Sequence, residues 1–278
     1  MTRRPAPSIP LITLLVIWRL GIPTEAAEPV VDDMIPTAAA ELAVDAMLDY
    51  AIEGAIVPGI HTRLETAHGV VHVWSPEGYK RETAAVVVYI HGYHVTVDDA
   101  WWAHGLPEQF GASGINALFI VCEAPSDPAD PVRWSSTTEL LRAVESGLGE
   151  PVPKGPVAAI GHSGAFRTLA QWLGDPRLGT VVLLDAGYGF KAPYLDWIRS
   201  AAHRRLITVA SDTLAWTTAL HRFLPSTHTV DGFAPWEPTE LAMLQAQRIL
   251  HIRTDLDHWQ VVTVALPATL RLLRAPPL

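Results

Sequence analysis

The chain is short of cysteine and of positive charge. It has one cysteine, Cys122, and so cannot form an internal disulfide bond. Cys122 lies in the apolar run of residues 117–122, where a buried, unreactive thiol is expected. Acidic residues outnumber Lys and Arg by 29 to 20, the formal net charge is −9, and no Lys/Arg-rich run supplies a local positive field. The sequence therefore argues against a nucleic-acid-binding protein and against attraction to an anionic membrane surface.

Long hydrophobic segments are also scarce. The main one, residues 9–18, follows Arg3 and Arg4, ends at Arg19 and precedes small residues over 21–27. This pattern resembles a secretory signal peptide, and it is short for a membrane span. We therefore expect residues 1–27 to be a signal peptide and the protein to be exported, to the periplasm or beyond. An uncleaved N-terminal anchor or an unprocessed apolar N-terminus is the alternative. After processing, no stable membrane insertion is expected.

Short apolar runs, by contrast, are abundant in a chain that is 49% hydrophobic. Runs without polar alternation are typical of strands covered on both faces. Six occur, at residues 84–90, 117–122, 157–160, 180–184, 206–210 and 249–252. Helix-like stretches lie among them at 99–110, 137–148, 165–173 and 213–224. This alternation predicts an α/β fold with a mostly parallel sheet. Ahead of it, residues 36–55 predict an amphipathic helix, and residues 61–74 predict a β-hairpin.

Ser163 stands in the string Gly161-His-Ser-Gly-Ala165, between the predicted strand 157–160 and the helix-like residues 166–173. The string alone is common by chance. Its setting is more informative, because a sharp strand-to-helix turn brings two backbones close together and needs small residues around it. Ser163 is therefore a candidate nucleophile as well as a small residue in a tight turn.

In this setting the sequence resembles the α/β-hydrolase family, whose nucleophilic serine occupies such a turn. Ala165 replaces the commoner second glycine, and the resemblance covers most of the chain after about Val70. It implies a three-layer α/β/α sandwich as one catalytic domain over residues 28–278. A histidine-glycine pair often follows the third strand of the family, and here His91 and Gly92 follow the run 84–90.

The same resemblance implies an oxyanion hole. Two N–H groups would hold the negatively charged oxygen that forms when the serine attacks a carbonyl carbon. By the family pattern these come from Gly164 and from the loop at Gly92 and Tyr93. We expect the Tyr93 N–H to be the second donor, with Gly92 permitting close approach.

A serine hydroxyl becomes nucleophilic only when an adjacent base takes its proton, so a histidine is required. The family's order of serine, acid and histidine implies a base after the last strand, and His258 follows the run 249–252. His162, next to Ser163 in the sequence, is expected to point elsewhere. The alternative bases are His221, His228 and His251.

Two aspartates compete for the role of orienting His258. Asp185 and Asp212 follow successive predicted strands. Asp212 fits the commoner placement, but it begins a helix-like stretch, where a carboxylate also serves as an N-cap. Asp185 is followed by a loop, which offers no such structural role. The prediction favours Asp185 and leaves Asp212 open.

The resulting hypothesis is a serine hydrolase that cleaves an ester bond in a small-molecule or polymer acyl substrate. Residues 225–240 are a candidate loop over the site, and the ten tryptophans suggest core packing or an aromatic-lined pocket. Acyl transfer, amidase or peptidase activity, and an inactive binding module are the alternatives. A metal site at His91, His94, Asp98 and Asp99 is disfavoured, because their spacing matches no ligand pattern. No cofactor is implied.

Overall fold

The computed structural model describes residues 58–233 and 236–278. The predicted signal peptide, residues 1–27, and the predicted helix over 36–55 lie outside the described residues. Among the helices that are described, none combines the length and the hydropathy needed to cross a membrane.

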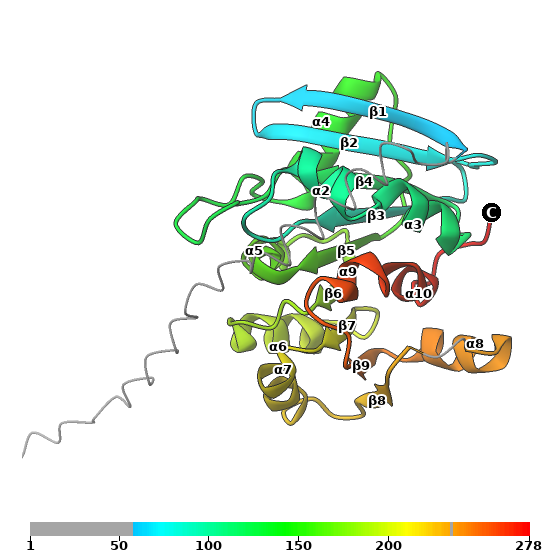
Figure 1. The fold of residues 1–278 in the computed structure, drawn as a ribbon. Coiled ribbons are helices and arrows are strands. Elements are labelled where there is room, and N and C mark those ends of the chain that lie inside the picture. The colour runs from blue at the N-terminus through cyan, green and yellow to red at the C-terminus, as the bar shows by residue number, and fades with distance from the viewer. Residues whose placement is uncertain (1–57, 234–235) are drawn as a thin grey trace, which may run out of the picture. The chain divides into compact units, whose positions relative to one another are not determined.

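The described residues form a nine-stranded sheet with the order β1-β2-β4-β3-β5-β6-β7-β9-β8 (Figure 1). Its strands are β1 (Gly59–Thr66), β2 (Gly69–Pro76), β3 (Ala85–Ile90), β4 (Ala117–Cys122), β5 (Val157–His162), β6 (Leu178–Leu184), β7 (Arg205–Ala210), β8 (His228–Asp231) and β9 (Ile249–Arg253). The hairpin β1–β2 joins β4 in antiparallel fashion, and all other neighbours are parallel. The mostly parallel sheet predicted from the apolar runs is confirmed. The C-terminal ends of its parallel strands all lie along one side of the sheet, which is called the carboxyl edge below.

Helices cover both faces of the sheet, and the alternation of side chains along each strand divides the core in two. In β3, for example, Val86 and Val88 belong to one core, whereas Val87 and Tyr89 belong to the other. The first core includes side chains of α4 (Thr137–Leu148), α5 (Phe166–Trp172), α6 (Lys191–Ser200) and α7 (Leu214–His221). The second includes side chains of α2 (Val97–Ala103), α3 (Leu106–Ser113), α8 (Pro238–Ala246), α9 (Gln260–Thr263) and α10 (Leu266–Arg271). The result is the expected three-layer α/β/α sandwich.

Two local predictions are wrong. The helix expected over 99–110 is two helices, α2 and α3, because the backbone turns left-handed at Gly105 (φ 55°). Residues 225–240, interpreted as a loop over the site, contain strand β8 and the start of α8. Val230, Phe233 and Trp236 of this segment pack against the second core, which draws the segment to the sheet edge.

Arg205, at the start of β7, ties the last helices to the sheet. Its side chain is 2% exposed and donates to the carbonyls of Leu244 (2.9 Å), Gln247 (2.6 Å) and Leu272 (2.6 Å). These carbonyls lie at the C-terminal ends of α8 and α10, where the helix dipole favours a positive charge. Burial, and less so the charge of Arg274, lowers the pKa of Arg205 to about 10, so it stays charged at neutral pH.

We expect Arg205→Met to lower the free energy of unfolding by about 3–5 kcal/mol, because the carbonyls of Gln247 and Leu272 lose their donor and the Leu244 carbonyl keeps only the Gln247 N–H. Urea unfolding followed by circular dichroism measures the change. Arg271→Met is the matched control, since Arg271 is exposed on α10, and there a change of less than about 0.5 kcal/mol is expected. Equal losses in the two variants would contradict this role for Arg205.

Candidate active site

The turn between β5 and α5 presents Ser163 at the carboxyl edge of the sheet. A short 3₁₀ turn, η1 (Ser163–Ala165), joins the two elements, and Ser163 has a left-handed backbone conformation (φ 50°). Such a conformation costs a non-glycine residue about 1–3 kcal/mol and persists only where its surroundings impose it. A Cβ atom on Gly161 would lie 2.9 Å from the Cβ of Ala165, so the turn closes only around small residues.

The loop after β3 packs directly against this turn. A Cβ atom on Gly92 would lie 2.7 Å from the Cβ of Ser163, which leaves no room for a side chain at position 92. The ring of Tyr93 lies against the backbone of Gly164. The structure therefore brings Gly92, Tyr93 and Gly164 together beside Ser163.

His91 fixes the orientation of this loop. It is fully buried, its Nδ1–H donates to the Gly92 carbonyl (2.7 Å), and its Nε2 accepts from the Ala124 N–H (3.0 Å). These two partners define one neutral tautomer. The Gly92 carbonyl belongs to the same trans peptide unit as the Tyr93 N–H, so the bond from His91 also sets the direction of that N–H. Within the described residues the Tyr93 N–H has no protein acceptor.

His258 follows β9 and is held by Asp185, which follows β6. The His258 Nδ1 lies 2.7 Å from Asp185 Oδ2; the Asp185 side chain is fully buried, whereas that of His258 is 19% exposed. Asp185 also has a left-handed backbone (φ 44°). Since a carboxylate can only accept, Nδ1 carries the proton and the lone pair of His258 is on Nε2.

The surroundings of Asp185 keep it ionised. Burial alone would raise the pKa of Asp185, but hydrogen bonds from His258, Thr213 and Ser211 outweigh burial and hold that pKa well below its usual range. Its Oδ1 accepts from the Ser211 N–H (3.0 Å), the Thr213 N–H (2.9 Å) and the Thr213 hydroxyl (2.7 Å). The carboxylate thus binds the backbone turn that leads into α7 as well as the histidine.

Asp212 lies next to this pair without replacing Asp185. Its own N–H donates to Asp185 Oδ2 (3.3 Å), and its exposed carboxylate comes within 4.8 Å of the ligand atoms of Asp185 and His258. The N-cap role considered for Asp212 does not occur, because the residue at the N-cap position of α7 is Thr213. The Thr213 side chain makes no capping hydrogen bond. A metal ion is poorly suited to this trio, since both oxygens of Asp185 already accept several hydrogen bonds.

His162, expected to point away from the site, instead supports His258. Its ring is buried 4.5 Å from the His258 ring, and its Nε2–H donates to the His258 carbonyl (3.0 Å). Burial, followed by the nearby His258 and His104, lowers the pKa of His162 well below its usual value, so the ring is neutral at neutral pH. Sequence reasoning missed this contact, because the neighbours of a residue that ends a strand depend on the packing of distant loops.

Tyr188 is a second residue that sequence reasoning missed. Burial raises the pKa of Tyr188, the charges of Asp185 and Asp212 raise it further, and a hydrogen bond with Ser163 opposes them. Its phenol therefore stays protonated beside the serine. Across the described part of the chain, no hydrogen bond joins the Ser163 hydroxyl to His258, and such bonds often tighten only when substrate is bound.

The remaining predicted candidates lie elsewhere. His221 and His251 share the hydroxyl of Thr208, and His228 begins the edge strand β8. Asp98 accepts from Arg63 and His72, while Asp99 closes a capping box with Thr96 at the start of α2.

The chain matched no family model and no curated protein. Several solved structures are similar in fold. A ferulic acid esterase superposes with a TM-score of 0.53 at 14% identity, over 78% of this chain and 97% of that one. A feruloyl esterase module from Clostridium thermocellum, complexed with sinapinate, gives 0.55 at 10% identity, over 81% and 91%. An S-formylglutathione hydrolase from Staphylococcus aureus gives 0.50 at 12% identity, over 78% and 100%.

Because the pKa of Asp185 is lowered in the folded protein, the free energy of unfolding should depend on pH in the acid range. Above about pH 4 the carboxylate is charged in both states and stabilises the fold; as the pH falls below that, the unfolded chain takes up a proton that the folded protein refuses. We expect Asp185→Asn to lower the free energy of unfolding by about 2–3 kcal/mol at pH 7, and the gap from the wild type to shrink between about pH 4 and pH 2.

Urea unfolding at a series of pH values tests this. Asp212→Asn is the matched control, because it keeps the backbone N–H that binds Asp185 and should cost less than about 1 kcal/mol. A gap between wild type and Asp185→Asn that stays constant down to pH 2 would contradict the proposed role of the carboxylate.

Proposed function

We propose, because this chain has the α/β-hydrolase fold, that it is a serine hydrolase that cleaves ester bonds with Ser163, His258 and Asp185. One observation carries the proposal: a buried, ionised Asp185 holds Nδ1 of His258 at 2.7 Å, on the sheet edge where Ser163 stands in a strained turn. A histidine fixed in this tautomer presents a bare Nε2, which is what a general base needs.

The reaction then has two halves. His258 Nε2 takes the proton of Ser163, whose Oγ bonds to the acyl carbon, and the N–H groups of Gly164 and Tyr93 hold the oxyanion. The tetrahedral intermediate collapses as the C–O bond to the alcohol breaks, and the alcohol leaves with the proton from His258. In the second half, water gives a proton to His258, attacks the acyl-serine and releases the acid, and the proton returns to Ser163.

An aromatic cluster beside Ser163 suits an apolar acyl group. Phe166 follows the turn, and its ring lies 6.1 Å from that of Tyr188 and 5.5 Å from that of Phe190. Phe190 is half exposed, although large apolar side chains usually seek cover. Esterases among the similar structures agree with ester chemistry in general. We infer a small-molecule or polymer ester whose acyl part rests on these rings.

We also propose that the protein is exported, with residues 28–278 as the mature catalytic domain. The support is the sequence alone: two arginines, an apolar stretch and small residues within positions 1–27.

Labelling with a fluorophosphonate probe tests the nucleophile first. We expect an adduct on Ser163, located by mass spectrometry, because only an activated serine reacts; Ser163→Ala should give none and should lose on the order of 10⁴ or more in ester hydrolysis. Absence of an adduct on protein shown to be folded would count against the hydrolase assignment. It would favour a binding module on the same fold.

The two aspartates make a separate kinetic prediction. Asp185→Asn should lower kcat for a p-nitrophenyl ester by on the order of 10³ or more, because the amide cannot hold His258 in the required tautomer. Asp212→Asn should lower it less than about tenfold, since Asp212 gives Asp185 only its backbone N–H. Equal losses of kcat in the two variants, or a larger loss in Asp212→Asn, would contradict the assignment of Asp185 as the residue that orients His258.

A further inference from the structure

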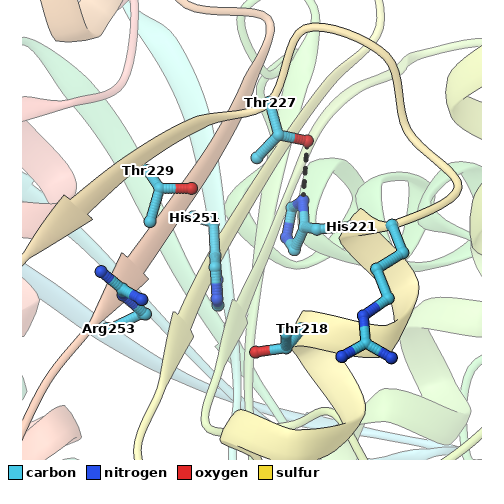
Figure 2. Close-up of a pocket in the computed structure, with 7 residues that line it drawn as sticks. Thr218, His221, Thr227, Thr229, His251 and Arg253 are labelled. Atoms are coloured by element: carbon cyan, nitrogen blue, oxygen red, sulfur yellow. Dashed lines mark hydrogen bonds between the residues drawn. The ribbon is translucent and has the colours of Figure 1, made fainter.

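A pocket of about 260 Å³ lies between α7 and the last strands of the sheet, away from the candidate active site (Figure 2). Its floor follows from strand register: Thr208 of β7 pairs with His251 of β9, which pairs with Thr229 of β8. These three side chains therefore point to the same face of the sheet. Thr218 and His221, near the C-terminal end of α7, form the facing wall.

A chain of hydrogen bonds runs under this pocket. The Thr208 hydroxyl lies 2.8 Å from both His221 Nε2 and His251 Nδ1, and His221 Nδ1 lies 3.1 Å from the Thr227 hydroxyl. The chain stops at His251, which is 3% exposed and whose Nε2 has no partner among the described residues. Figure 2 shows the His251 ring directed into the pocket. A buried polar atom without a partner costs free energy, which a ligand at this place would recover.

The charges around the pocket decide which ligand it suits. Arg222 and Arg253 line it, and none of its described lining residues is acidic. Asp231 holds Arg253 through Nε (2.6 Å) and Nη2 (2.8 Å), which leaves Nη1 of Arg253 for another acceptor. Burial lowers the pKa of His221 to about 3, helped by His251, and that of His251 to about 4, helped by Arg253, so both rings are neutral at neutral pH.

We propose that this pocket binds a small oxyanion, a phosphate or a carboxylate, between Arg222, Arg253 and the Nε2–H of His251. This site is independent of the proposed catalytic function and uses none of its residues. Arginine is suited to both anions because its planar fork of N–H donors matches their oxygens.

The Thr208 hydroxyl couples the tautomer of His251 to that of His221. It has one hydrogen for two imidazole nitrogens, so it donates to one ring and accepts from the other. If it donates to His251 Nδ1, the free His251 Nε2 carries a hydrogen, and His221 Nδ1 accepts from the Thr227 hydroxyl, which then gives up its longer bond to the Leu224 carbonyl (3.4 Å). If it donates to His221, His251 Nε2 is a bare lone pair that repels an anion. Binding of an oxyanion selects the first arrangement throughout the chain of hydrogen bonds.

Titration of the full chain with inorganic phosphate, and separately with acetate, at constant ionic strength tests the proposal. Imidazole nitrogen signals in NMR of ¹⁵N-histidine-labelled protein report the site directly. We expect saturable shifts at His251 and His221, with the one proton of the neutral His251 ring on Nε2 in the bound state, and isothermal calorimetry should give a dissociation constant of about 1 mM or below. The phosphate and acetate titrations distinguish which anion the pocket prefers.

The double variant Arg222→Gln/Arg253→Gln should weaken phosphate binding at least about tenfold, because two charged donors are lost. The matched control is Arg142→Gln/Arg271→Gln, which removes the same charge from exposed positions on α4 and α10 and should leave binding unchanged. The arginines in both pairs are exposed, so all variants should fold.

Three results would overturn the proposal. They are no shift at His251 in the wild type, shifts confined to His258 and His162 beside Ser163, or equal weakening by the two double variants. The last would indicate general charge screening. None of these results bears on the fluorophosphonate labelling of Ser163, so the two proposals fail separately.

Discussion

The buried carboxylate of Asp185 is the interaction on which the site depends. It joins three segments that are distant in the sequence: its own turn after β6, the backbone turn that leads from β7 into α7, and His258 after β9. A buried carboxylate without partners would be protonated or would destabilise the fold. Here the donors that keep it charged are also the groups whose positions it sets, so the geometry of His258 follows from the same bonds that stabilise the sheet edge.

Two buried histidines support this arrangement from either side. His91 orients the peptide that carries the Tyr93 N–H, and His162 binds the carbonyl of His258. Each ring offers one donor in a direction set by packing, and burial keeps the His162 ring neutral in the neutral pH range because it lowers the pKa of that histidine. His258 differs in that it is partly exposed and keeps one nitrogen free. Histidine thus orients neighbouring backbone groups where it is buried and is a candidate base where it is partly exposed.

Apolar runs predicted the central strands well, because strands covered on both faces must be apolar throughout. They could not find β8, whose residues His228-Thr-Val-Asp231 are polar because an edge strand faces water. The serine turn was predictable from its local requirement for small residues. The sequence favoured Asp185 over Asp212 only because a loop follows Asp185, and the tertiary structure adds that Asp212 offers its backbone N–H while Asp185 offers its carboxylate. His162 and Tyr188 have no sequence pattern at all, because their contacts come from loops that meet only in the fold.

Strands β7 and β9, with the turns that follow them, contribute residues to both the pocket and the candidate active site. Thr208 of β7 lies beneath the pocket, and Ser211, just past the end of β7, donates its N–H to Asp185. Along β9, His251 faces the pocket, and the chain reaches His258 seven residues later. β7 and β9 are hydrogen-bonded neighbours next to the edge strand β8, so the pocket and the candidate active site share one packed stretch of backbone. Within the described residues, the side-chain hydrogen bonds of the pocket run from Thr227 through His221 and Thr208 to His251 and do not reach Asp185, so any influence between the sites has to pass through the backbone.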